Sequence, residues 1–108
     1  MKDYASMSDF EINEAVGRFV YLPHLCVSNG VCLYEKDDIW TEFDPCNNPA
    51  DAWPILLENH IAIAPYKNAT PCAWPSAEGL ISKRVTEDAN PLRAGMITFL
   101  KMKERKND

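Results

Sequence analysis

The amino-acid sequence predicts a single-domain α+β sandwich, in which three helices cover a short antiparallel sheet of about five strands. Two kinds of local signal carry this prediction. The pairs Asn48-Pro49 and Asn90-Pro91 mark helix starts, because an Asn side chain can cap the first free backbone N–H groups and a proline has no N–H to lose. Asn29-Gly30, between two strand-like runs, is the strongest short-range signal for a β-hairpin.

The first helix is expected to begin at Asp9. Ser8 and Glu11 form a capping box, in which each side chain can bond the other residue's backbone N–H group. An apolar stripe with helical spacing follows at Ile12, Ala15, Val16 and Phe19. This stripe should pack on the core, and the helix should end near Phe19 or Val20.

A β-hairpin is predicted over residues 25–34, followed by a third strand. A two-residue turn at Asn29-Gly30 pairs Ser28 with Val31 and fixes the register of the strands. Neighbouring residues of a strand point to opposite faces, so Cys26 and Cys32 cannot bridge or share a metal. After an acidic turn, residues 39–43 alternate again and extend the meander.

The second helix should begin with a turn at Pro49 and kink or restart at Pro54, because a proline ring inside a helix costs about 3 kcal/mol. Three apolar side chains are expected to face the core: Trp53, Leu56 and Leu57. Asn59 is expected to close the helix in the left-handed conformation.

The remaining chain holds a strand at residues 61–64, a long irregular segment over 65–79, a strand over 80–86 and a final helix capped by Asn90. The irregular segment carries three prolines and Trp74, and loops of this length are often functional. The final helix presents one apolar face: Leu92, Met96, Phe99 and Leu100. Gly95 would let another element approach that helix closely.

The composition is that of an ordinary globular domain spanning residues 1–108, with 46% hydrophobic and 25% charged residues. The net charge of −5 argues against binding nucleic acid through its phosphates. No apolar run approaches the roughly 20 residues that cross a bilayer, and the first ten residues lack the apolar core of a signal peptide. We therefore expect a cytoplasmic protein with reduced cysteines and no membrane or nucleic-acid partner.

The four Cys and two His residues predict no metal site, because the sequence contains no C-x-x-C pair and no H-x₃₋₅-H pair. No motif for a cofactor or a catalytic group is present either. Cys46 precedes a helix N-terminus, where the helix dipole can lower the pKa of a thiol. A Cys-dependent enzyme is thus the third functional hypothesis, and an inert, buried Cys46 is its alternative.

An anion site is conceivable where the helices that start at Asn48 and Asn90 converge, because helix N-termini offer free N–H groups to an anion. Cationic and aromatic side chains would complete this site: Lys83, Arg84, Arg93, Trp53 and Trp74. The alternative is that both Asn residues only cap their helices, and that Arg93 pairs with a carboxylate.

Three segments carry a resemblance to a known family: residues 8–13, residues 46–55, and residues 90–97 with their Asn-Pro-Leu-Arg-Ala start. In these segments the chain resembles the NinX-like domain of unknown function from temperate phages and prophages of enteric bacteria. It is also distantly similar to the phage ABA sandwich domain, in which a sheet lies between helices. The resemblance implies a small, nonessential phage accessory protein, and it supplies no catalytic residues.

Two non-enzymatic functions follow as hypotheses. In the first, the protein counters a host defence by sequestering a small anionic, nucleotide-like ligand at the site of Asn48 and Asn90, and a homo-oligomer is one form that it can take. In the alternative, it inhibits or redirects a host protein through an acidic surface: Asp37, Asp38, Glu42 and Asp44.

Overall fold

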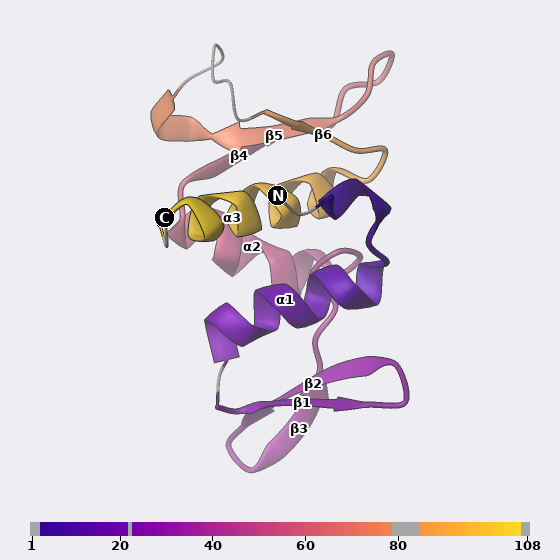
Figure 1. Cartoon of the computed structure of the whole chain (residues 1–108), viewed down its shortest axis with the longest axis vertical. Coiled ribbons are helices and arrows are strands. Elements are labelled where there is room, and N and C mark those ends of the chain that lie inside the picture. Colours follow the sequence, from indigo (N-terminus) through magenta and orange to yellow (C-terminus); the bar gives the residue numbers. More distant parts are fainter. Residues whose placement is uncertain (1–2, 22, 79–84, 107–108) are drawn as a thin grey trace.

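The computed structural model describes residues 3–21, 23–78 and 85–106, and within them three helices lie between two three-stranded antiparallel sheets (Figure 1). The helices are α1 (Asp9–Tyr21), α2 (Pro49–Glu58) and α3 (Pro91–Lys106). One sheet contains β1 (Leu25–Ser28), β2 (Val31–Lys36) and β3 (Ile39–Glu42). The other contains β4 (Ile61–Ala64), β5 (Cys72–Pro75) and β6 (Thr86–Glu87). Short 3₁₀ turns occur at Tyr4–Ser6 and Ser76–Glu78.

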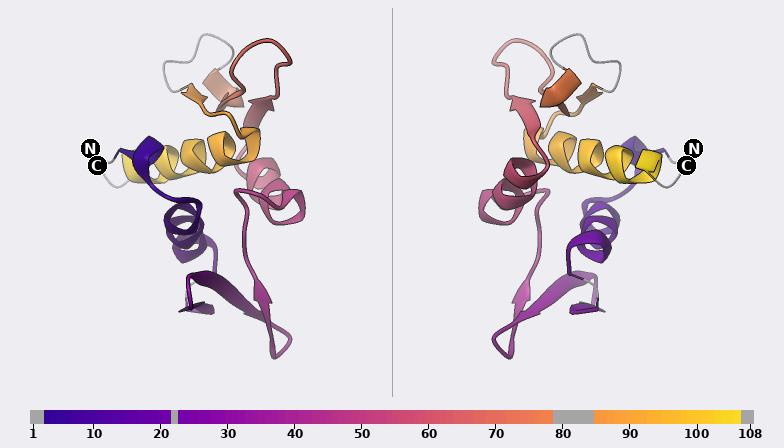
Figure 2. Two further views of the ribbon diagram at one scale, coloured as in Figure 1. Left: turned by 90° about the vertical axis from the view of Figure 1, so that its right-hand side faces the viewer. Right: turned by 90° about the vertical axis from the view of Figure 1, so that its left-hand side faces the viewer.

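The α+β class is therefore confirmed, whereas the prediction of one sheet of about five strands is wrong. The order of layers also differs from the ABA arrangement, because here the helices lie between the sheets (Figure 1). Figure 2 shows α1 and α2 on opposite sides of the molecule, with α3 crossing above them. Among the described helices, none is long and apolar enough to span a membrane.

The central helix α3 packs against two helices and the β4–β6 sheet. It is buried on nearly all sides, through Ala94, Met96, Ile97, Phe99 and Leu100. A helix that is apolar all round must be covered on every side. The helices α1 and α2 and the strands β4, β5 and β6 all contact it, so the predicted apolar face was right but too narrow.

Gly95 is the point of closest approach to α3. A Cβ atom at this position would lie 2.6 Å from Cδ2 of Leu56 in α2 and 3.2 Å from Cγ2 of Ile63 in β4. Real Cβ atoms do not come this close to other atoms, so the absence of a side chain lets α2 and β4 pack directly on the helix. The close approach expected at Gly95 is thus confirmed.

The start of α1 follows its capping box. The backbone N–H of Glu11 donates to Oγ of Ser8 at 3.1 Å, and the N–H of Ser8 donates to Oε1 of Glu11 at 2.9 Å. Ile12 and Val16 are fully buried, but Phe19 is 50% exposed, with its ring perpendicular to that of Phe99. The helix runs to Tyr21, slightly beyond the predicted end.

The β1–β2 hairpin has the predicted register, with Ser28 opposite Val31 and Cys26 opposite Leu33. Asn29 and Gly30 adopt positive φ angles of 53° and 74°, as a two-residue hairpin turn requires. A second such turn joins β2 to β3, where Asp37 and Asp38 have φ angles of 54° and 64°. Local turn chemistry therefore fixes all three strands.

The β1–β3 sheet has an inner and an outer face. Cys32 and Phe43 point inward and are almost fully buried, and Phe43 packs edge-on against Tyr21 and Tyr34. The alternate residues lie on what we call the outer face: Cys26, Val31, Leu33, Glu35, Trp40 and Glu42. No helix of the described chain covers this outer face (Figure 1).

The predictions for α2 were right at its start, Pro49, and largely wrong over its later turns. The helix continues through Pro54 without a break, because Ala50, whose carbonyl loses its usual partner, is exposed to solvent. Leu56 is buried as expected, but Trp53 is 58% and Leu57 60% exposed. At the C-terminal end His60, not Asn59, takes the left-handed conformation.

The segment predicted to be irregular contains β5, which pairs with β4. Its Ala73 is fully buried, so this strand covers α3. Trp74, its neighbour, is half-buried and lies opposite Ala62. The predicted strand over 80–86 falls mostly outside the described residues. Its last residue, Thr86, belongs to β6 and pairs with Ala73.

Candidate functional site

The helix N-termini are tied together by short polar contacts in the segment that precedes α2. Asn90, the cap of α3, donates from Nδ2 to the carbonyl oxygen of Cys46 at 2.6 Å. Asn47 donates to Oδ2 of Asp9, the first residue of α1, at 3.1 Å. The starts of α2 and α3, which the sequence singled out, therefore do come together, and the start of α1 joins them.

Both Asn caps are used by their own helices. Oδ1 of Asn48 accepts from the N–H of Ala50 at 3.0 Å, and Oδ1 of Asn90 accepts from the N–H groups of Leu92 and Arg93 at 3.0 and 3.3 Å. These N–H groups already have a hydrogen-bond acceptor, so they are not available to bind an anion.

Arg93 lies at the centre of this junction and is only 8% exposed. Its guanidinium donates five hydrogen bonds, to the carboxylates of Asp9 and Asp88 and to the backbone carbonyls of Tyr4, Ala5 and Met7. Burial disfavours its charged form, but the hydrogen bonds to Asp9 and Asp88 and their charges outweigh this effect and raise its pKa. The structure thus gives Arg93 the ion-pairing role that the sequence left as the alternative.

Asp44 is also bound within the protein. Its Oδ1 accepts from Nδ2 of Asn13 at 2.7 Å, and its backbone N–H donates to Oδ2 of Asp51 at 2.9 Å. The amide oxygen of Asn13 in turn accepts from the N–H of Cys46 at 3.1 Å. Asp44 and the buried Asn13 therefore hold the chain between β3 and α2 against α1.

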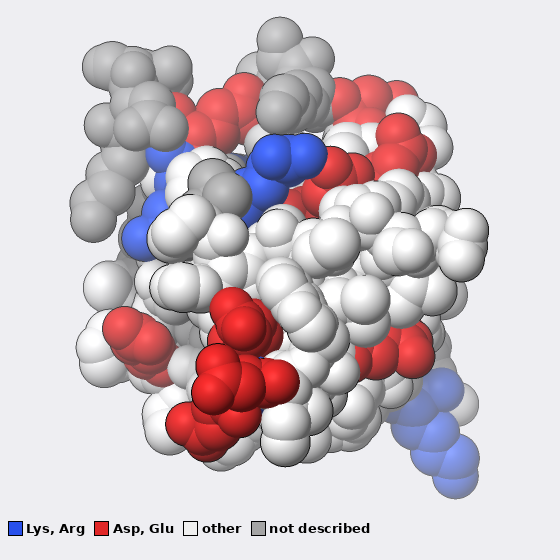
Figure 3. Space-filling view, turned by 90° about the horizontal axis from the view of Figure 1, so that it is seen from below, with Lys and Arg blue, Asp and Glu red and all other residues white. Residues whose placement is uncertain are grey.

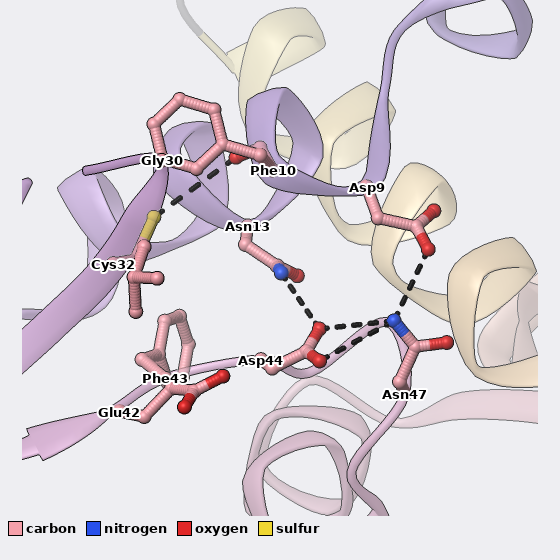
Figure 4. Close-up of a pocket in the computed structure, with 10 residues that line it drawn as sticks. Asp9, Phe10, Asn13, Gly30, Cys32, Glu42, Phe43, Asp44 and Asn47 are labelled. Atoms are coloured by element: carbon pink, nitrogen blue, oxygen red, sulfur yellow. Dashed lines mark hydrogen bonds between the residues drawn. The ribbon is translucent and has the colours of Figure 1, made fainter.

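A recess of about 150 Å³ opens beside this network, between the start of α1 and the end of β3 (Figure 4). Three carboxylates line it, from Asp9, Glu42 and Asp44, together with the amides of Asn13 and Asn47. Figure 4 shows Asp44 between these two amides. Phe10 and Phe43 supply apolar wall, and none of the described lining residues is Lys or Arg. The recess therefore favours a cationic group over an anion.

A second recess, of about 250 Å³, lies between the N-terminal residues and β6. Its cation, Lys101, donates to Oγ1 of Thr86 at 3.0 Å, and Asp3 and Glu87 share the lining. Neither recess includes Asn48, Asn90 or Arg93.

The other residues of the predicted anion site are scattered or not described. Trp53 faces solvent on α2, and Trp74 lies half-buried on β5. Lys83 and Arg84 lie outside the described residues. The described part of the chain therefore does not assemble a cationic pocket from this set.

Three of the four predicted acidic residues are exposed on the β2–β3 hairpin: Asp37, Asp38 and Glu42. The sequence reasoning missed their apolar neighbours, Ile39 at 64% and Trp40 at 49% exposure. The alternation of the strand was the available signal, because adjacent residues point to opposite faces and only one of Ile39 and Trp40 can face the helices.

Cys46 is not an activated thiol, so the structure favours the inert, buried Cys46 that the sequence left as the alternative. Its side chain is fully buried, and burial, followed by the negative charge of Asp9, raises its pKa to about 12. Burial likewise raises the pKa of Cys32 to about 11. The helix dipole is outweighed, because a thiolate here would lie without water and near three carboxylates.

This burial predicts selective alkylation. In a variant with Cys26→Ser and Cys72→Ser, native protein treated with iodoacetamide at pH 8 should gain no adduct within an hour, because Cys32 and Cys46 remain protonated and covered. In urea both thiols should react. Intact-mass spectrometry counts the adducts, and a native adduct at Cys46 would contradict the structure.

These features describe a small α+β protein with an acidic recess at the junction of its helices and a mixed acidic and apolar hairpin beside it. The chain belongs to the family described as Bacteriophage P22, NinX, whose match covers residues 3–103. The resemblance found in the sequence is thereby confirmed. Searches of curated proteins and of solved structures returned no match.

Proposed function

We propose that this protein is a non-enzymatic phage accessory protein that binds a basic surface of a host protein in the bacterial cytoplasm. The observation that carries the proposal is the β2–β3 hairpin, where Trp40 is exposed on the outer face among carboxylates. Its neighbour Ile39 points to the other face and is exposed beside the Asp37-Asp38 turn. The contact surface is the outer face together with the Asp37-Asp38 turn.

Trp40 is the natural anchor of such a surface. It lies on β3 opposite Glu35 and is half-exposed, although burial of a tryptophan is among the most favourable contacts that an interface can make. Val31 and Leu33 on β2 lie on the same face and extend its apolar area. An uncovered apolar area with a polar rim is typical of a protein-binding site.

The charges around Trp40 select the partner. Glu35, Glu42 and the turn residues Asp37 and Asp38 are acidic, whereas Lys36 is the cation of this hairpin. Figure 3, which views this end of the molecule, shows red acidic groups around a broad white area. Complementary charge speeds association and excludes wrong partners, so a basic surface fits best.

Sequestration of a small anion has less support from the geometry. Arg93 is committed to Asp9, Asp88 and backbone carbonyls, and the recess beside it is lined by carboxylates. An anion entering there would be repelled unless it brought its own cations. We therefore favour the protein-binding function over this alternative.

The test places a photo-crosslinking amino acid at position 40 or at position 66 in the phage-infected host. Tyr66 is 51% exposed in the β4–β5 connection, at the far end of the molecule (Figure 1). A host protein with a basic surface should crosslink from position 40 and not from position 66. Crosslinking from position 66 alone, or a discrete anionic ligand in the native mass spectrum of the host-purified protein, would overturn the proposal.

Once the partner is identified, two variants distinguish the effect of Trp40 on the dissociation rate from the effect of the acidic turn on the association rate. Trp40→Ala should raise Kd by about tenfold or more, mainly through faster dissociation. The double change Asp37→Asn and Asp38→Gly removes two charges and keeps a favourable turn, so it should slow association and flatten its salt dependence. Tyr66→Ala is the matched control and should change neither rate.

A further inference from the structure

The strand β3 forms an open edge of the β1–β3 sheet. It pairs with β2 on one side, and in the described part of the chain no strand pairs with its other side. All four of its residues are exposed. The neighbouring helix α1 contacts β1 and β2. Figures 1 and 2 show the β2–β3 hairpin projecting from one end of the molecule, so the free edge of β3 is accessible to a partner.

The hydrogen-bonding pattern identifies the backbone groups that this edge presents. The N–H of Phe43, the residue after β3, donates to the carbonyl oxygen of Cys32 at 2.8 Å, so the backbone groups of Phe43 point toward β2. In an antiparallel pair, successive residues point alternately toward the partner strand and away from it. Thr41 therefore also points toward β2, whereas the N–H and C=O groups of Trp40 and Glu42 point away from it. These groups can pair with an added strand.

The side chains beside the open edge differ between the two faces of the sheet. Trp40 and Glu42 lie on the outer face, where Glu35 is opposite Trp40. Ile39 lies on the other face, opposite Lys36, and β3 has no acidic side chain on that face. The outer face therefore favours basic side chains, which can pair with the carboxylates and stack on Trp40. The other face favours apolar side chains.

Building on the proposed function, we propose that the host protein adds an extended segment to β3 as a fourth, antiparallel strand of this sheet, and that the segment alternates basic with apolar residues. The backbone groups of Trp40 and Glu42 supply affinity, and the alternating side chains supply specificity, as is general for strand addition. The basic residues lie on the outer face, and the apolar residues lie beside Ile39.

The charges of β3 select against other strands. An open edge invites self-association, and short or charged edge strands suppress it. Strand addition between two copies of β3 would bring together the carboxylates of Asp38 and Glu42, in a chain whose net charge is −5. A basic segment meets the same carboxylates with the opposite charge. The strand β1, at the other edge of the sheet, carries no charged residue and lacks this selectivity.

NMR spectroscopy of the isotope-labelled protein tests strand addition with a synthetic peptide of about eight residues that alternates Arg with Val. At saturation, hydrogen exchange of the Trp40 and Glu42 amides should slow by about tenfold or more, because both become donors to the added strand. The amides of Leu25 and Val27, which point to the open edge of β1, should not change. A control peptide that alternates Glu with Val should not bind, because its charges are repelled.

Two substitutions at one position isolate the backbone contribution. Glu42→Gln and Glu42→Pro both remove the charge, but only proline removes the free N–H. A proline is tolerated on an edge strand where its N–H would face solvent, and circular dichroism spectra should show that both variants keep the native fold. Glu42→Pro should raise the Kd of the Arg–Val peptide by about fivefold or more relative to Glu42→Gln, which is the effect of one lost hydrogen bond.

Strand addition would be overturned by an Arg–Val peptide that does not bind, or that binds without slowing exchange at Trp40 and Glu42. Equal Kd values for the two Glu42 variants would overturn it as well. Crosslinking in the host keeps the two proposals apart. A crosslink from position 40 that forms equally in Glu42→Gln and Glu42→Pro would leave host binding in place without strand addition, whereas no crosslink from position 40 would overturn both.

Discussion

Replacing Arg93 by Met should lower the free energy of unfolding by about 3–5 kcal/mol, the usual cost of removing one partner from a buried ion pair. The change leaves Asp88, with 19% of its side chain exposed, next to Asp9 without the intervening cation. It also removes the donor for the carbonyls of Tyr4, Ala5 and Met7. Domains of this size have only about 5–15 kcal/mol of stability, so the variant should be close to unfolding.

Urea unfolding at neutral pH measures this loss. Arg18→Met is the matched control: Arg18 also pairs with a carboxylate, that of Glu14 one turn away, but its side chain is 57% exposed. Its loss should cost about 0.5 kcal/mol or less. Arg93→Lys should lie near Arg93→Met, because an ammonium group cannot reproduce the forked contacts. A cost below about 1 kcal/mol for Arg93→Met would show that the junction is not a stabilising centre.

Replacing Phe43 by Ala should cost about 3–5 kcal/mol, as expected for a large aromatic side chain that is removed from a core. Phe43 is 1% exposed and packs edge-on against Tyr21, with ring centroids 5.0 Å apart, and against Tyr34 at 6.0 Å. It is the residue that follows β3 and joins the β1–β3 sheet to α1. The cavity should therefore loosen the sheet that carries the proposed host-binding surface.

Hydrogen exchange separates this local effect from global unfolding. The Phe43→Ala substitution should accelerate the exchange of the amides of β1, β2 and β3 more than that of the amides of α3, because the neighbours of α3 are unchanged. Phe19→Ala is the control, because Phe19 is 50% exposed and its loss should cost under about 1 kcal/mol. Equal acceleration in β1–β3 and α3 would contradict the local assignment.

The features that the sequence predicted correctly depend on contacts between close neighbours. Ser8 and Glu11 are three residues apart, and Asn29 with Gly30 forms a turn without help from the rest of the chain. Such contacts determine where helices start and how strands pair. The family resemblance rests on the same short segments and was confirmed.

The wrong predictions concern features that depend on contacts between residues far apart in the sequence. In α2 both faces are apolar, so its periodicity could not decide whether Trp53 or Ile55 faces the core. The two sheets are separate because β1 and β2 pack on α1, whereas β4, β5 and β6 pack on α3, which is distant in the sequence. Asp9 is 84 residues from Arg93, so its pairing had no local signal.

The candidate site was predictable in part for the same reason. Its acidic turn follows from two adjacent residues, Asp37 and Asp38. The recess brings together α1, the Gly30 turn and the chain after β3, and only the tertiary structure joins them. The raised pKa of Cys46 likewise comes from its burial near Asp9.

The contacts between the two ends of the chain constrain how the protein is made. Arg93 binds carbonyls of residues 4–7, and the hydroxyl of Tyr4 donates to Oε2 of Glu104 at 2.6 Å. A ribosome adds about 5–20 residues per second, and these contacts form only after α3 has left its exit tunnel. The nascent chain therefore lacks its central helix until residues 91–106 have left the tunnel, and the domain completes its folding only then.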